Sequence, residues 1–253
     1  MANQLRASLY TLVRNWRVWV ALGLVALNKA IAVESVMRGV TYGLQDSIFR
    51  DKRLIAIMLF AGAAVAVFDQ RGGALRSSCL AERGRGRYAL SRCAMVATLV
   101  LALLGVAALL DVVAGALVPG ASVIAASPDM CSPGRVAAGL LTYLVIGETA
   151  FLAALLSRSR SALAAAGMVA VAYVGLSLLV VAVVPAGSPT ASGTTISELI
   201  GSLLPLAGLK ADVMFAPYAS LIPLDPAHAF VVPLAWLAAI VVLARLDVAR
   251  RAV

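Results

Sequence analysis

The sequence has little charge and few of the side chains that usually carry chemistry. Charged residues make up 13% of its 253 residues, whereas a soluble domain carries about 25%. The chain has one histidine, His228, and three cysteines without metal-ligand spacing, which excludes a histidine-rich zinc site and makes a disulfide framework unexpected. It also lacks the Gly-x-Ser-x-Gly and His-Glu-x-x-His patterns of hydrolases. We therefore expect no catalytic residues, no metal site and no enzyme activity.

Nucleotide and nucleic-acid motifs are absent as well. A P-loop needs Gly-Lys followed by Ser or Thr, but the three lysines follow Asn28, Asp51 and Leu209. This chain cannot bind ATP by that route, and we expect it to hold no cofactor of its own. The formal net charge is +9, yet basic and aromatic residues are not interleaved in the way that stacks nucleic-acid bases. No nucleic-acid partner is therefore expected.

Long apolar runs make up most of the chain, of which 62% is hydrophobic. A helix needs about 20 apolar residues to cross a hydrocarbon layer about 30 Å thick. Six runs reach this length alone or with flanking residues: 18–27, 54–68, 94–118, 136–156, 162–184 and 229–244. They predict an all-α integral membrane protein with six transmembrane helices, which form a single domain over residues 1–253.

The distribution of charge predicts the orientation, because Lys and Arg collect in cytoplasmic loops. With six spans and both termini cytoplasmic, 14 of the 21 basic residues lie inside. The basic cluster 50–53 is left outside and opposes this topology. The run 18–27 also fits a cleaved signal peptide. The charge bias favours a retained helix, because loss of this span would place the arginine-rich segment 68–93 outside.

Two further segments are predicted from their patterns. Residues 1–17 read as an amphipathic helix in the membrane interface, with Trp16 and Trp19 at the headgroups. Five apolar side chains form its stripe: Leu5, Leu9, Leu12, Val13 and Trp16. Residues 185–228 form an extracytoplasmic loop with six of the ten prolines. This loop either carries short helices against the outer face or is only partly ordered.

The predicted cytoplasmic loop 68–93 is the most basic part of the chain and contains six arginines. Gly72-Gly73 and Gly84 bracket ten residues without a helix breaker, so residues 74–83 are predicted to form a short helix. Leu75, Cys79 and Glu82 share one face of it, at i, i+4 and i+7. A helix connected in this way to two spanning helices can transmit force to both.

Basic residues also flank a tyrosine where the next spanning helix begins. Cations and an aromatic ring at this depth are suited to anionic headgroups. The predicted anchoring residues in this stretch are Arg85, Arg87, Tyr88 and Arg92.

Two charged residues lie inside predicted spans, where ionisable groups mark functional sites or helix interfaces. Glu148 lies near the middle of 136–156, and Lys29 follows the first apolar run. We expect both to line a translocation pathway or a helix interface, with a contact between them, a contact of Glu148 with a hydroxyl, or a protonated Glu148 as alternatives. Asp111 lies near the outer boundary and is expected to be solvated.

Three stretches carry a resemblance to a known family. They are FDQRGGALR at 68–76, RGRGRYALSR at 83–92 and LLSRSRSALA at 155–164. Together with the layout, they resemble the permease subunit of a type-2 ABC exporter, which has an interfacial N-terminal helix, six spans and a coupling helix between the second and third. Gly72 stands where the family often has Ser, and Arg92 where it often has Lys.

The resemblance implies that a separate P-loop ATPase, which holds the ATP, docks under residues 74–83 of this chain. The residues implied in docking are Leu75, Arg76, Cys79, Leu80, Glu82 and Arg83. It also implies that the pathway forms with a second copy or a related permease, in contact with lipid in the cell membrane. The high ratio of Arg to Lys is typical of a GC-rich bacterium. The alternative function is an ATP-independent secondary transporter or a membrane scaffold.

Overall fold

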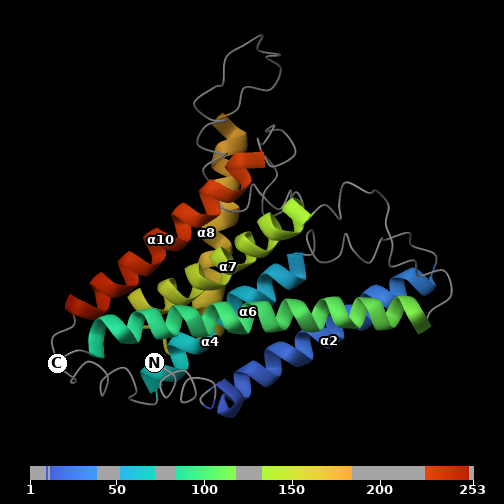
Figure 1. Ribbon diagram of the computed structural model, residues 1–253, viewed down its shortest axis with the longest axis horizontal. Coiled ribbons are helices and arrows are strands. Elements are labelled where there is room, and N and C mark those ends of the chain that lie inside the picture. Colours follow the sequence, from blue (N-terminus) through green and yellow to red (C-terminus); the bar gives the residue numbers. More distant parts are fainter. Residues whose placement is uncertain are drawn as a thin grey trace, which may run out of the picture.

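The computed structural model describes residues 10, 12–38, 52–71, 84–117, 133–183 and 226–250. Within these ranges the chain is helical and contains no strand. The main helices are α2 (Trp16–Met37), α4 (Lys52–Arg71), α6 (Gly84–Leu117), α7 (Pro133–Leu156), α8 (Ala162–Val183) and α10 (Pro226–Arg250). Successive helices run back and forth across the molecule (Figure 1). The predicted all-α class is confirmed.

Five of the described helices, α2, α4, α6, α7 and α10, are long and apolar enough to cross a membrane. The described apolar part of α8 is shorter, although the helix has 22 residues and none of them is charged. The structure is therefore consistent with a multi-pass membrane protein. The count of six spans and the orientation of the termini stay predictions.

The helix α4 forms the centre of the fold. In the most apolar stretch of α4, 72% of the residues are buried, against 28% in the corresponding stretches of α2 and α10. It packs against α7, α8, α2 and α6, and every side chain from 63 to 67 is fully buried. A helix that is apolar on all sides is stable only when neighbours cover it.

The closest approach in the core joins α4 to α7, the pair with the most extensive contact. A Cβ atom added at Gly62 would lie 2.0 Å from the backbone oxygen of Gly147. A Cβ added at Gly147 would lie 2.6 Å from Cγ2 of Val100 on α6. Small residues let helix backbones approach closely in membrane proteins. These two glycines therefore fix the distance between α4, α7 and α6.

The start of α2 is defined by Asn15. Its Oδ1 accepts a hydrogen bond from the backbone N–H of Arg17 at 3.2 Å, as a helix cap does. Trp16 and Trp19 are 62% and 58% exposed, and the Trp19 indole N–H donates to the Val13 carbonyl at 2.8 Å. Only part of the predicted interfacial helix 1–17 lies within the described residues. Its headgroup contacts stay a prediction.

A tight turn joins α7 to α8. The N–H of Ser159 donates to the Ala154 carbonyl, and the N–H of Arg158 donates to the Leu155 carbonyl, which together form a Schellman motif. Arg158 adopts a positive φ of 50°, a conformation that favours glycine. The Ser161 hydroxyl then accepts a bond from the N–H of Ala164 and caps α8.

Replacing Arg158 with glycine should stabilise the protein by about 1 kcal/mol, because glycine adopts the left-handed conformation without the Cβ clash. Thermal unfolding of the purified protein in detergent measures this gain. Arg160→Gly, in the same turn but without a positive φ, is the matched control and should not stabilise. Equal melting temperatures for Arg158→Gly and the control would contradict the explanation.

Candidate functional site

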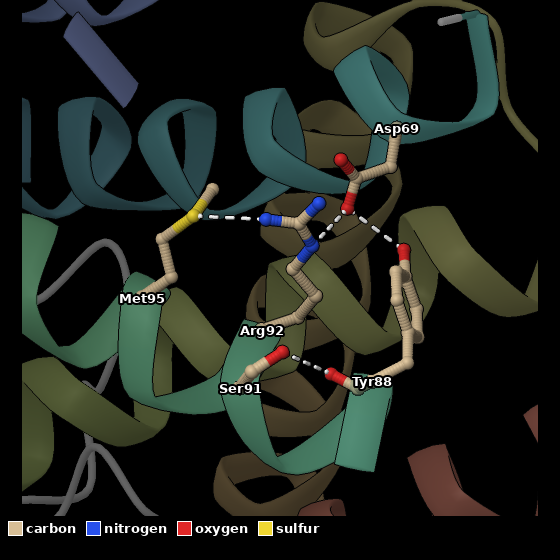
Figure 2. Close-up of polar contacts among 5 residues, drawn as sticks. All are labelled: Asp69, Tyr88, Ser91, Arg92 and Met95. Atoms are coloured by element: carbon tan, nitrogen blue, oxygen red, sulfur yellow. Dashed lines mark hydrogen bonds and ion pairs between the residues drawn. The ribbon is translucent and has the colours of Figure 1, made fainter. Parts of the chain in front are cut away.

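A buried polar cluster joins the end of α4 to the start of α6. Asp69 Oδ2 accepts a hydrogen bond from the Tyr88 hydroxyl at 2.7 Å and lies 2.7 Å from Nε of Arg92. Figure 2 shows the aspartate between its two partners from α6. The three residues are 0%, 5% and 8% exposed, respectively. We call Asp69, Tyr88 and Arg92 the α4–α6 clamp.

The guanidinium group of Arg92 has two further contacts that hold it in place. Its Nη1 lies 3.2 Å from the Met95 sulfur, and its carbon lies 5.3 Å from the Tyr88 ring centroid, a cation–π distance. The contact of Nε with Asp69 is an ion pair without hydrogen-bond geometry, and Asp69 Oδ1 has no hydrogen-bond partner in the described part of the chain. Removing one partner of a buried ion pair is strongly destabilising, because the other charge is left buried without a counter-charge.

Tyr88 and Arg92 therefore lie inside the protein and not at the headgroups, where they were predicted to lie. Their side chains are buried against Asp69, whereas Arg87 is exposed and remains available for anchoring. The side chain of Arg85 lies outside the described residues. Tyr88 and Arg92 are four residues apart and share a helix face, which is the sequence signal that could have paired them with an acid.

Replacing Tyr88 with phenylalanine should destabilise the protein by about 1.5–3 kcal/mol, because the buried carboxylate loses a charge-assisted hydrogen bond. Tyr173→Phe is the matched control, since the Tyr173 hydroxyl donates to the neutral Thr149 hydroxyl at 3.3 Å. We expect a smaller loss there. Thermal unfolding in detergent compares the stability of the two variants. Equal losses of stability would mean that the hydrogen bond to Asp69 contributes no more than one between neutral hydroxyls.

The residues after Asp69 attach the same end of α4 to the turn between α7 and α8. Gln70 Nε2 donates to the Ala154 carbonyl at 3.0 Å, and Arg71 Nη2 donates to the Arg160 carbonyl at 2.6 Å. Two of the three sequence stretches that carried the family resemblance therefore meet here, through Arg71 of the first and Arg160 of the last. The clamp and these two bonds connect α4, α6 and the α7–α8 turn at one end of the bundle.

A second buried ion pair joins α2 to α6. Lys29 Nζ lies 2.7 Å from Asp111 Oδ2, and the two side chains are 3% and 4% exposed. The expectation that Asp111 is solvated is wrong, because the long helix α6 carries it into the protein beside α2. Lys29 lies at a helix interface, one of its two predicted roles, and its partner is Asp111.

Glu148 lies at the interface between α7 and α6. The residue is 3% exposed, and its carboxyl group lies within electrostatic reach of the Cys93 thiol of α6. Its Oε2 has no hydrogen-bond partner among the described residues. The neighbouring Thr142 hydroxyl donates to the Ala138 carbonyl in its own helix. The interface role of Glu148 fits this position, while a role in a pathway stays a prediction.

Several predicted features lie outside the described residues. They are the helix 74–83 with its docking residues, and most of the loop 185–228; the loop's last residues begin α10. The docking role of Leu75, Arg76, Cys79, Leu80, Glu82 and Arg83 therefore stays a prediction. Among the described residues, no group of three or more His, Cys, Asp or Glu side chains could hold a metal ion.

In the described residues, fold and site together are consistent with an all-α multi-pass membrane protein that has buried ion pairs between its helices. Compared with known proteins, the sequence matches no family model, and no curated protein matches it. The resemblance to ABC permeases therefore rests on the three sequence stretches and the layout.

Proposed function

We propose that this chain is the transmembrane permease subunit of an ABC exporter. It forms the substrate pathway with a second permease and is driven by a separate P-loop ATPase. The observation that carries the proposal is the α4–α6 clamp. It ties together the two helices that enter and leave the glycine-bracketed segment, through partners only 2.7 Å from Asp69. The proposed docking site lies between those helices.

The clamp gives the proposal a mechanical basis. A displacement of the segment between α4 and α6 would move both helices together, because Asp69 is bound to two residues of α6. Gln70 and Arg71 pass it on to the turn that joins α7 to α8. Packed cores transmit strain because they deform little. Docking and release of the ATPase would therefore move four helices together, which alternating exposure of a pathway requires.

Replacing Leu75 with aspartate should abolish co-purification of the ATPase, because a charge is placed on the apolar face of the proposed docking helix. Membrane insertion should be unchanged, since the residue lies between spans. Leu156→Asp is the matched control: Leu156 is 53% exposed at the end of α7, and this variant should keep the ATPase. Mass spectrometry after affinity purification gives the readout. An ATPase retained by Leu75→Asp would remove the docking claim.

A specific observation supports a second candidate, an ATP-independent secondary transporter. The buried pair of Lys29 and Asp111, together with Glu148, places ionisable groups inside helices built to cross a membrane. Such groups are used in ion and proton pathways. Substrate uptake or efflux driven by an ion gradient, in vesicles without any ATPase, would favour this candidate over the first.

A further inference from the structure

The helix α2 is the least apolar of the five described helices that are long enough to cross a membrane. Its uncharged part, residues 18–28, lies between Arg17 and Lys29. At about 1.5 Å per residue this part is roughly 16 Å long, which is about half the thickness of the hydrocarbon layer. With Trp16 at the headgroups, as the sequence predicts, a crossing α2 carries Lys29 into the hydrocarbon. A lysine is among the costliest residues to insert there.

The structure places a counter-charge for this lysine on α6. Lys29 Nζ lies 2.7 Å from Asp111 Oδ2, and both side chains are almost fully buried. The helix α2 packs against α6 and α4, so the pair lies in a covered helix interface. A lysine paired with an aspartate brings no net charge into the membrane, whereas a lysine without this aspartate does.

The two helices differ in how much they need each other. In α6, residues 93–110 carry no charge before Asp111. At about 1.5 Å per residue they are roughly 27 Å long, close to the thickness of the hydrocarbon layer. The helix α6 can therefore cross on its own apolar length, whereas α2 takes the counter-charge of its lysine from α6.

The same helix α2 contains the small-residue pattern that fits a signal-peptide cleavage site, Ala30-Ile31-Ala32. In the structure α2 continues through this pattern, and the Ser35 hydroxyl donates to the Ile31 carbonyl at 2.9 Å. Cleavage after Ala32 would interrupt a hydrogen-bonded helix. It would also remove Lys29 and leave the Asp111 carboxylate buried without this cation. Both observations favour retention of the segment.

We propose that the chain is not cleaved after Ala32 and that α2 is a dependent span, which stays across the membrane because Asp111 of α6 neutralises Lys29. The helix α6 is thus the partner within the chain that α2 needs for its place in the membrane. This inference rests on the multi-pass membrane character of the fold and does not depend on an ATPase.

Labelling from one side of the membrane tests the dependence. The three native cysteines are replaced by serine, and a single cysteine is introduced at Arg14 or at Glu34, which are exposed near the two ends of α2. A membrane-impermeant thiol reagent, applied to intact cells, should label one of these positions and not the other. With Asp111→Leu this difference should shrink by about tenfold or more, because a lysine without its counter-charge opposes insertion.

The double variant Lys29→Leu/Asp111→Leu is the matched control. Without the lysine, α2 needs no counter-charge, so one-sided labelling should return. A protein that merely fails to fold after the loss of Asp111 would not recover in this way. Unchanged one-sided labelling in Asp111→Leu, or its continued loss in the double variant, would overturn the dependence of α2 on α6.

The mass of the intact protein tests retention of the segment. The protein is purified through a tag at its C-terminus, and its mass should include the residues up to Ala32. A purified protein that begins at Val33 would overturn the proposal, whatever the labelling shows.

Discussion

Replacing Gly62 with alanine should destabilise the protein by about 3 kcal/mol or more. The new Cβ would lie 2.0 Å from the Gly147 backbone oxygen, a distance that no rotamer can relieve. Overpacking a core costs about 1–3 kcal/mol when side chains can shift. Here α4 and α7 must move apart, because the obstacle is backbone. We expect the loss to exceed that range or the variant to aggregate.

Gly105→Ala is the matched control for this prediction. Gly105 also lies inside an apolar helix, but a Cβ there would meet nothing within 4 Å. Alanine is the better helix former by about 1 kcal/mol, so this variant should be as stable as the native protein or more so. Thermal unfolding and size-exclusion chromatography in detergent compare the two. A Gly62→Ala protein that melts like Gly105→Ala would show that α4 and α7 do not cross at these glycines.

Replacing Asp69 with alanine should cost about 3–5 kcal/mol, because it leaves the Arg92 guanidinium buried without its counter-charge. Removing both charges in Asp69→Leu/Arg92→Met should restore most of the loss, since a well-packed apolar pair replaces a buried ion pair at little cost. Thermal unfolding of the native protein, Asp69→Leu, Arg92→Met and the double variant gives the coupling free energy between the two positions.

The exposed pair of Glu34 and Arg38 is the matched control for that cycle. Its side chains are 58% and 75% exposed, and exposed ion pairs contribute about 1 kcal/mol or less. Glu34→Ala should therefore change the free energy of unfolding little. If Asp69→Ala were as harmless as Glu34→Ala, the α4–α6 clamp would have no part in holding the two helices together.

The helices could be predicted from the sequence because the signal for a spanning helix is local. Apolar runs placed α4, α6, α7, α8 and α10 close to their observed positions, and the charge around Lys29 made the first run the weakest prediction. The turn at 157–161 was also evident, from its serines and arginines between two apolar runs. Length and composition are sufficient for predictions of this kind.

The partners of the buried charges could not be predicted, because they depend on how helices far apart in sequence pack. Asp69 is separated from Arg92 by the loop, and Lys29 from Asp111 by the helix α4. A charge near a helix end looks solvated in sequence until a neighbouring helix covers it, as α2 covers Asp111. The approach of Gly62 to Gly147 was equally hidden, since each is an ordinary glycine in an apolar run.

The central claim is that this membrane protein works with a separate ATP-hydrolysing subunit. The most direct measurement is affinity purification of the tagged protein in mild detergent, followed by mass spectrometry of the proteins that accompany it. We predict an accompanying P-loop ATPase whose activity depends on residues 74–83. A protein purified alone, under conditions in which a known ABC transporter keeps its ATPase, would contradict the claim and leave the arginines of 68–93 to orient the chain in the membrane.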